Sequence, residues 1–147
     1  MKYTEVSFAV DLDSVVNHGP NLKGVLNPDF GVFWEWESDY VSLKCEGYFQ
    51  KTAQYRGGFV YHVAGDQTYR AVRLKLAPGA LTVAARQPKT LGITADARQL
   101  FGGFPGAALT LDLTQPDPTT SIMAGSNATK LADNYARMFA VENTATY

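Results

Sequence analysis

Alternation of apolar and polar residues is the strongest pattern in the first three quarters of the chain, and it predicts β-strands. Within residues 2–12 the apolar side chains occupy every second position: Val6, Phe8, Val10 and Leu12. A period of two is typical of a strand with one buried face. We therefore expect a sheet of five or more strands. Further strand-like runs follow at residues 30–37, 40–50, 59–63, 68–77 and 107–115.

The central strands can pair in two ways. Residues 40–50 can form a hairpin with residues 58–63, or residues 58–63 can pair with residues 68–77 across the short turn between them. We prefer the second pairing because residues 68–77 lead directly into a long segment, 78–106, that is rich in Gly, Ala and Pro. A loop of this length inside a compact domain usually carries a function.

Near the C-terminus the period changes to 3.6 residues, which predicts a helix. Asp117 and Pro118 resemble an N-cap followed by a proline in the first helical position. One such helix cannot cover the predicted sheet, so we expect a second copy of the chain to bury the rest in an obligate dimer. The apolar stripe predicted for the dimer interface is Leu131, Tyr135, Met138 and Phe139.

Composition limits the classes of protein to which the chain can belong. Its 147 residues, 46% of them hydrophobic, predict one globular domain with a core of its own. No apolar run is long enough for a transmembrane helix, and the first residues lack the apolar segment of a signal peptide. The single cysteine excludes an intrachain disulfide and a cysteine-rich zinc site.

The charges are balanced overall but not along the chain. Residues 1–39 hold two basic and seven acidic residues, whereas residues 40–100 hold nine basic and three acidic ones. The net charge of −1 argues against a general nucleic-acid binder. The basic middle is consistent either with a polyanion bound on one surface or with an ordinary solvated face.

Candidate catalytic and metal-binding residues are few. Asp11, Asp13 and His18 could supply oxygen and nitrogen ligands, but such a set often arises by chance, and we expect no metal centre. His62 is interpreted as a hydrogen-bonded sheet residue rather than a base, and Cys45 as a small buried hydrophobic residue. Because no convergent acid, base or metal set is evident, we expect a protein that is not an enzyme and needs no cofactor.

Basic, aromatic and hydroxyl side chains share the polar faces of several predicted strands. Such a face suits single-stranded RNA, because phosphates contact Lys and Arg, bases stack on Tyr, and Thr and Asp hydrogen-bond base edges. A solvated sheet face explains the same pattern. The predicted RNA-binding residues are Lys44, Tyr48, Tyr69, Arg73, Lys75, Thr110, Asp112 and Thr114.

Three segments carry a resemblance to a known family: Gly31–Trp36 with Ser42–Gln50 and Ala53–Arg56, then Ala108–Gln115, and the polar tail Glu142–Tyr147. They resemble the coat proteins of single-stranded RNA bacteriophages, the levivirus group. The order of the elements (hairpin, meander, long loop, final strand, helices) is similar to that family over nearly the whole chain.

The resemblance implies an α+β fold in a single coat-protein domain spanning residues 1–147. Residues 1–29 would form an N-terminal hairpin, residues 30–115 a five-stranded sheet with the long loop 78–106, and residues 116–147 the helices and tail. It implies an intertwined homodimer that assembles into an icosahedral shell around a single-stranded RNA genome. The protein would then lie in the virion, assembled in the bacterial cytoplasm without a membrane partner, and would also bind an RNA hairpin as a translational repressor.

A second interpretation needs no partner chain. A small monomeric β-barrel or sandwich could bind an apolar ligand, with Trp34, Trp36 and Tyr61 lining the cavity. It differs from the first in predicting a monomer whose own chain covers the apolar face of the sheet.

Overall fold

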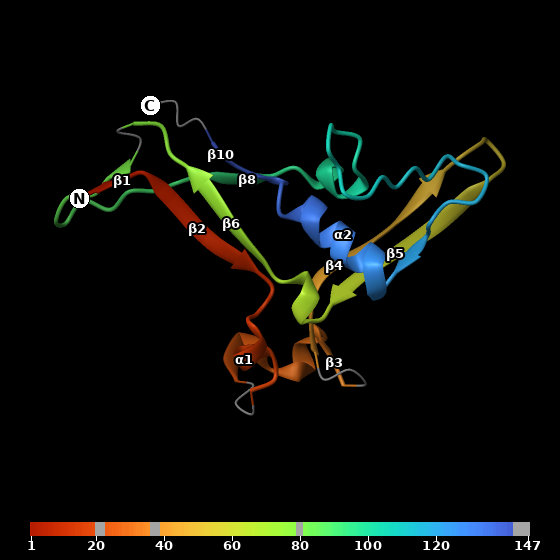
Figure 1. The fold of residues 1–147 in the computed structure, drawn as a ribbon, viewed down its shortest axis with the longest axis horizontal. Helices are drawn as coiled ribbons and strands as arrows, with labels where there is room; N and C mark the ends of the chain where they lie inside the picture. The colour runs from red at the N-terminus through yellow and green to blue at the C-terminus, as the bar shows by residue number, and fades with distance from the viewer. Residues whose placement is uncertain (20–22, 36–38, 79–80, 143–147) are drawn as a thin grey trace.

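The computed structural model describes residues 1–19, 23–35, 39–78 and 81–142, and the chain folds as a small α+β protein made mostly of strands (Figure 1). The predicted α+β class is therefore confirmed. The elements, in chain order, are β1 (Lys2–Tyr3), β2 (Glu5–Val10), α1 (Ser14–Asn17), η1 (Gly24–Leu26), η2 (Pro28–Phe30), β3 (Phe33–Trp34), β4 (Asp39–Gln50), β5 (Arg56–Ala64), η3 (Asp66–Thr68), β6 (Arg70–Lys75), β7 (Leu81–Thr82), β8 (Ile93–Ala95), η4 (Ala97–Phe101), β9 (Ser121–Ile122), α2 (Gly125–Tyr135) and β10 (Phe139–Val141).

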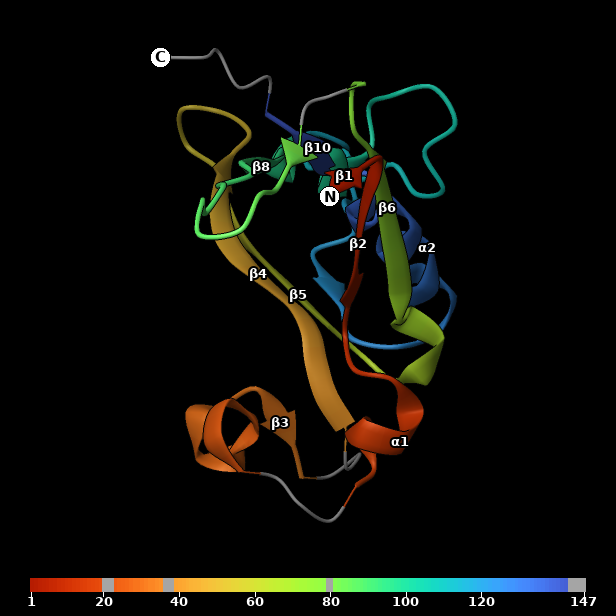
Figure 2. The ribbon, with the colours of Figure 1, turned by 90° about the vertical axis from the view of Figure 1, so that its left-hand side faces the viewer.

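Two antiparallel ribbons form the frame of the molecule. β4 and β5 pair as a long hairpin, which Figure 2 shows as a curved ribbon, with β3 at one end of β4 and the short β9 running parallel to β5. β2 pairs with β6 from Glu5↔Lys75 to Val10↔Arg70. In the view of Figure 1 the two ribbons diverge from η3, and α2 lies in the angle between them.

The core lies where α2 meets β5. Tyr61 and Val63 from β5 and Leu131 and Tyr135 from α2 are all 0% exposed. Burying each of these large side chains contributes about 1.5–3 kcal/mol to folding. The cluster is completed by Leu100, Leu111, Ile122, Ala128 and Ala132. One helix of the same chain therefore covers β5, because the strands form several small sheets rather than one broad face.

The apolar stripe predicted near the C-terminus is divided between two elements. Leu131 and Tyr135 lie in α2 and pack inward, but the helix ends at Tyr135 and Phe139 belongs to β10. The Phe139 ring packs edge-on against Phe8 at 5.0 Å between ring centroids, and Met138 is half-buried against the core. The four residues predicted at a dimer interface thus already have partners within the chain.

Several predicted pairings are wrong. The two described strands within residues 1–29 do not pair with each other as a hairpin, since β1 pairs with β7 and β2 pairs with β6. Residues 58–63 pair with residues 40–50, the less favoured of the two solutions, because residues 65–68 do not form a hairpin turn. Gly65, at φ +100°, leads instead into η3, which redirects the chain away from β5.

The later segments also differ from expectation. The predicted long loop 78–106 contains β7, β8 and η4. Residues 107–115 form no strand, because the buried Asn134 amide holds them: Asn134 Nδ2 donates to the carbonyl oxygens of Leu100 and Leu109, and Oδ1 accepts from the N–H of Ala108. No helix starts at Asp117, and β9 precedes α2.

Candidate metal centre

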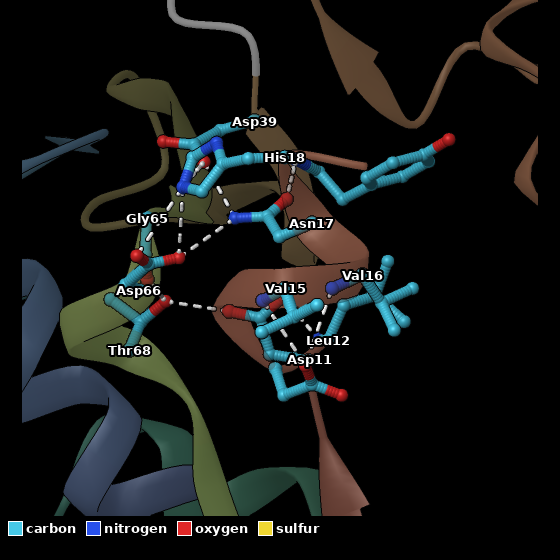
Figure 3. Close-up of polar contacts among 12 residues, drawn as sticks. Asp11, Leu12, Val15, Val16, Asn17, His18, Asp39, Gly65, Asp66 and Thr68 are labelled. Atoms are coloured by element: carbon cyan, nitrogen blue, oxygen red, sulfur yellow. Dashed lines mark hydrogen bonds and ion pairs between the residues drawn. The ribbon is translucent and has the colours of Figure 1, made fainter. Parts of the chain in front are cut away.

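A short helix places two adjacent polar residues at one end of the molecule. Asp13 caps α1, its Oδ1 accepting from the N–H groups of Val15 at 3.1 Å and Val16 at 3.2 Å. An aspartate cap of this kind satisfies N–H groups that have no partner in the first helical turn. The single turn ends at Asn17, with His18 as its C-cap. The side chains of Asn17 and His18 point toward η3 and the start of β4 (Figure 3).

Asn17 joins two carboxylates that are distant in sequence. The residue is 1% exposed, and its Nδ2 donates to Asp39 Oδ1 at 2.6 Å and to Asp66 Oδ1 at 3.0 Å. Its Oδ1 accepts from the backbone N–H of Tyr40 at 2.9 Å. The amide therefore brings the start of β4 and the start of η3 together.

His18 completes a cluster of potential metal ligands. Its Nε2 lies 3.2 Å from Asp66 Oδ1 and 3.7 Å from Asp39 Oδ1, and one ligand atom from each of the three residues lies within 4.8 Å of the others. A cation bound at about 2.0–2.2 Å from imidazole nitrogen and carboxylate oxygen requires donor separations of roughly 3–4 Å. The two separations measured from His18 Nε2 lie within this range.

The site is anchored on one side and open on the other. Asp39 is buried, whereas the side chains of His18 and Asp66 are 48% and 45% exposed. An ion could therefore enter from solvent past His18 and Asp66. The half-open position also leaves room for water as a further ligand.

A third carboxylate borders the cluster without joining it. Asp11 Oδ2 accepts from the Thr68 hydroxyl at 3.0 Å, and Asp11 Oδ1 accepts from the N–H of Leu12. Burial raises the pKa of the Asp11 carboxyl, and the nearby negative charges of Asp39 and Asp66 raise it further. The backbone of Asp11, at φ 83°, lies in the left-handed region that favours glycine. The side-chain hydrogen bonds hold this turn closed.

Sequence reasoning found one member of the cluster. The sequence analysis considered Asp11, Asp13 and His18 as ligands and expected no metal centre. Of these three, only His18 belongs to the cluster, since Asp13 caps α1 and Asp11 turns toward Thr68. Asp39 and Asp66 were missed because they are 21 and 48 residues from His18 in sequence, and only the tertiary fold brings them near it. The available signal was an acidic residue at the start of a predicted strand and another in a turn.

The predicted RNA-binding residues do not share a face. Arg73 and Lys75 lie on β6 and Lys44 and Tyr48 on β4, in different sheets, while Tyr69 precedes β6. The Arg56 guanidinium lies over the Tyr48 ring at 4.6 Å. The irregular segment 107–115 holds the remaining three residues, Thr110, Asp112 and Thr114. Within it, Asp112 Oδ1 accepts from both the N–H and the hydroxyl of Thr114.

Two other predictions about single residues are confirmed. His62 Nε2 lies 2.5 Å from Glu46 Oε1 across the β4–β5 hairpin, a hydrogen-bonded sheet histidine. Cys45 is half-buried against the core, and burial raises the pKa of its thiol, with the Glu46 carboxylate adding to the effect. Both effects favour the neutral thiol over the thiolate.

Of the three aromatic residues predicted to line a cavity, the structure describes Trp34 and Tyr61. Tyr61 is fully buried and its hydroxyl donates to the carbonyl oxygen of Thr119 at 2.7 Å. The Trp34 ring lies 6.3 Å from the His62 ring, and Trp36 lies outside the described residues. A hollow of about 320 Å³ is instead lined by Glu46, Gly47, Tyr48, Gly58, Phe59 and Val60.

Fold and site together define a small, strand-rich α+β module with a cluster of nitrogen and oxygen donors at one end. The family model MbnP matches residues 1–124, and the chain belongs to this family. Searches of curated proteins and of solved structures give no match. Among the described helices, none has the length and apolar character needed to cross a membrane.

The family assignment corrects the resemblance to phage coat proteins. The chain is not a levivirus coat subunit, and the capsid role and the virion localisation implied by the resemblance are wrong. The resemblance rested on short segments and on an order of elements that the structure does not reproduce. The fold and family agree better with the second interpretation, a small β-rich module.

Proposed function

We propose that this protein binds a divalent transition-metal ion at His18, Asp39 and Asp66. One observation carries the proposal: three donor atoms from distant parts of the chain converge within 4.8 Å. Two carboxylates supply negative charge that offsets the charge of the cation, and the imidazole supplies a nitrogen donor of the kind that transition metals prefer.

The family supports copper as the first candidate ion. MbnP is a family of methanobactin-related, copper-binding proteins. The donors in the cluster are nitrogen and oxygen rather than sulfur, which suits Cu²⁺ better than Cu⁺. Bound copper would supply a Lewis-acidic centre with open positions. His18 and Asp66 would bind it from the solvent side, and Asp39 from the buried side.

Metal titration tests this proposal. Isothermal titration should show one Cu²⁺ per chain, and His18→Gln should weaken binding at least about tenfold. The electron paramagnetic resonance spectrum of bound Cu²⁺ should also lose its imidazole nitrogen signature in that variant. His62→Gln, which alters the other histidine of the chain, is the matched control and should bind like the parent.

The two acidic ligands are tested in the same way. Asp39→Asn and Asp66→Asn should each lower Cu²⁺ affinity, whereas Asp112→Asn, an exposed aspartate in a distant turn, should not. Equal binding by the parent and all three ligand variants would show that copper binds elsewhere. Absence of binding to the parent would refute the proposal.

The hollow on the β4–β5 hairpin supports a second candidate function, the binding of a small apolar ligand. Phe59 and Val60 supply apolar walls beside Tyr48. A fluorescent hydrophobic probe should bind the protein, and Val60→Glu should abolish binding while Val25→Glu, at an exposed position in η1, should not. If Val60→Glu leaves the probe fluorescence unchanged, the probe does not bind in the hollow.

A further inference from the structure

We infer that the outer edge of β4, over residues 44–50, binds an extended peptide as an additional strand. A large apolar side chain of the peptide fills the hollow on the β4–β5 hairpin, and an acidic side chain pairs with Lys44. The inference rests on the second candidate function, binding in that hollow, and names a peptide as the bound molecule.

Most of β4 has a partner strand on one side only. β3 reaches its outer edge at the first residues of β4, and the Val41 N–H donates to the carbonyl oxygen of Val32 at 2.8 Å. Over residues 44–50 the only partner of β4 among the described strands is β5. β4 lies on the side of the hairpin turned away from α2 (Figure 2). The edge that β3 begins to fill is therefore open along the rest of the strand.

The strand register shows which backbone groups face that edge. Val60 is the partner of Glu46, and its N–H points away from β4, since it donates to the carbonyl oxygen of Thr120 at 2.8 Å. In an antiparallel pair, opposite residues direct their N–H and C=O groups either toward each other or both away, and the two arrangements alternate. The backbone groups of Lys44, Glu46 and Tyr48 therefore face outward, where no described residue hydrogen-bonds them.

The edge lacks two features that commonly prevent a further strand from pairing. Residues 44–50 contain no proline, and the one irregularity in the pairing with β5 lies earlier, between Val41 and Leu43. Prolines and β-bulges are among the devices by which proteins block an exposed strand edge. Main-chain hydrogen bonds along such an edge give affinity for an extended peptide, and pockets for alternate side chains give specificity.

The hollow supplies such a pocket beside the same residues. It is lined by three consecutive residues of β4, 46–48, and by their partners on β5, 58–60. Its volume of about 320 Å³ is close to the lower limit of about 300 Å³ for ligand pockets, which suits one large side chain. Gly58 leaves the space open, because a Cβ atom there would lie 3.7 Å from its nearest neighbours, the Tyr48 ring among them.

Lys44 provides a charged anchor next to the hollow. Its side chain is 53% exposed, and Nζ lies 3.8 Å from Glu46 Oε1, beyond hydrogen-bond distance. The Glu46 carboxylate instead contacts His62 Nε2 at 2.5 Å. Side chains two positions apart share a face of an extended strand. A peptide with an acidic residue two positions from a large apolar one therefore reaches both Lys44 and the hollow.

Hydrogen exchange tests the strand addition directly. The probe is the peptide Ser-Val-Phe-Val-Asp-Val-Ser with blocked ends. At saturation it should slow exchange at the N–H groups of Lys44, Glu46 and Tyr48 at least about tenfold. The N–H groups of Cys45 and Gly47, which face β5, are the internal control and should change little. Unchanged exchange at the three outward N–H groups in the saturated complex would overturn the inference.

Two variants test the side-chain contacts, with binding measured by fluorescence anisotropy of a labelled peptide. Gly58→Val fills the hollow and should weaken binding at least about tenfold. Lys44→Glu should weaken binding of this peptide and strengthen binding of the same peptide with Lys in place of Asp. Lys130→Glu, at an exposed position of α2, is the matched control and should bind like the parent.

The outcomes separate the inference from the second candidate function. If the hydrophobic probe binds the parent but the peptide does not, the hollow is a ligand site and the inference is wrong. If neither binds, both are wrong. A mass of two chains without peptide, with the outward N–H groups already protected, would assign the edge to a second copy and overturn the inference. If Gly58→Val does not fold, as judged by circular dichroism, the charge reversal at Lys44 decides.

Discussion

The hydroxyl of Tyr135 in α2 donates a hydrogen bond to the backbone carbonyl oxygen of Thr68 in η3. This contact links the core helix to the turn that carries Asp66, one of the candidate ligands. Thr68 is itself fully buried, and its own hydroxyl reaches both Asp11 and the carbonyl oxygen of Gly65. The candidate metal centre is therefore continuous with the packed interior.

Removing the Tyr135 hydroxyl should destabilise the fold. Tyr135→Phe leaves the Thr68 carbonyl without this partner, which should cost about 1–3 kcal/mol in the free energy of unfolding. Urea denaturation followed by circular dichroism measures the loss. Tyr55→Phe, at a half-exposed loop position, should change the free energy by less than about 0.5 kcal/mol.

The protein should be a monomer in solution, because α2 already covers β5 of its own chain. Light scattering coupled to gel filtration should give the mass of one chain, 16.0 kDa. Leu131→Ala should lower the free energy of unfolding by about 2–5 kcal/mol without changing that mass. If the urea concentration at the midpoint of unfolding rises with protein concentration, the protein is instead a dimer.

Asn134 should be essential for ordering residues 100–111. Its amide makes three hydrogen bonds to Leu100, Ala108 and Leu109. Asn134→Ala leaves buried backbone groups unpaired, so a loss of at least about 3 kcal/mol is expected. Hydrogen exchange should then speed up at Ala108 before it does in β4 and β5. If hydrogen exchange speeds up equally at all residues of the variant, Asn134 does not act locally on residues 100–111.

The turn at Asp112 should be sensitive to strong acid. Hydrogen bonds from Thr114 and Gln115 lower the pKa of the Asp112 carboxyl to about 2, below the usual 3.8. Because the folded pKa is the lower one, the turn gains stability above pH 3.8 and loses it as the pH falls through about 2. A carboxyl-carbon NMR titration should give a midpoint near 2, and Thr114→Ala should move it upward. A titration midpoint near the usual 3.8 in the parent protein would show that Asp112 does not accept these hydrogen bonds in solution.

Cys45 should react slowly with thiol reagents. Burial raises the pKa of its thiol, so little thiolate exists at neutral pH. The rate of reaction with a disulfide reagent should increase greatly in urea, where the core opens. Equally fast reaction in native protein would show that the thiol is more accessible than its place against the core indicates.

Local patterns in the sequence predicted individual elements well. Alternation placed strands at residues 2–12 and 40–50, and the 3.6-residue period predicted the buried faces of Leu131 and Tyr135. Each of these signals arises from residues near one another in the chain. They report which face of an element is buried, but not which partner buries it.

The partners of the strands and the residues of the candidate metal centre could not be predicted from these local patterns. The partner of β2 is β6, and the choice depends on a turn at Gly65 whose φ is not visible in the residue pattern. The site depends on Asn17 reaching Asp39 and Asp66 through space. The sequence analysis named His18 as a possible ligand but expected no metal centre, and it did not identify Asp39 or Asp66.

The long sequence separation between β2 and β6 has a consequence for synthesis of the chain on the ribosome. Between 60 and 70 residues separate the paired positions of these strands. Strand β2 must therefore wait until the whole β4–β5 hairpin has been translated before its own partner, β6, exists. The β4–β5 hairpin, whose two strands are neighbours along the chain, is available first, so its early formation would give the nascent chain a template on which the amino-terminal strand later closes.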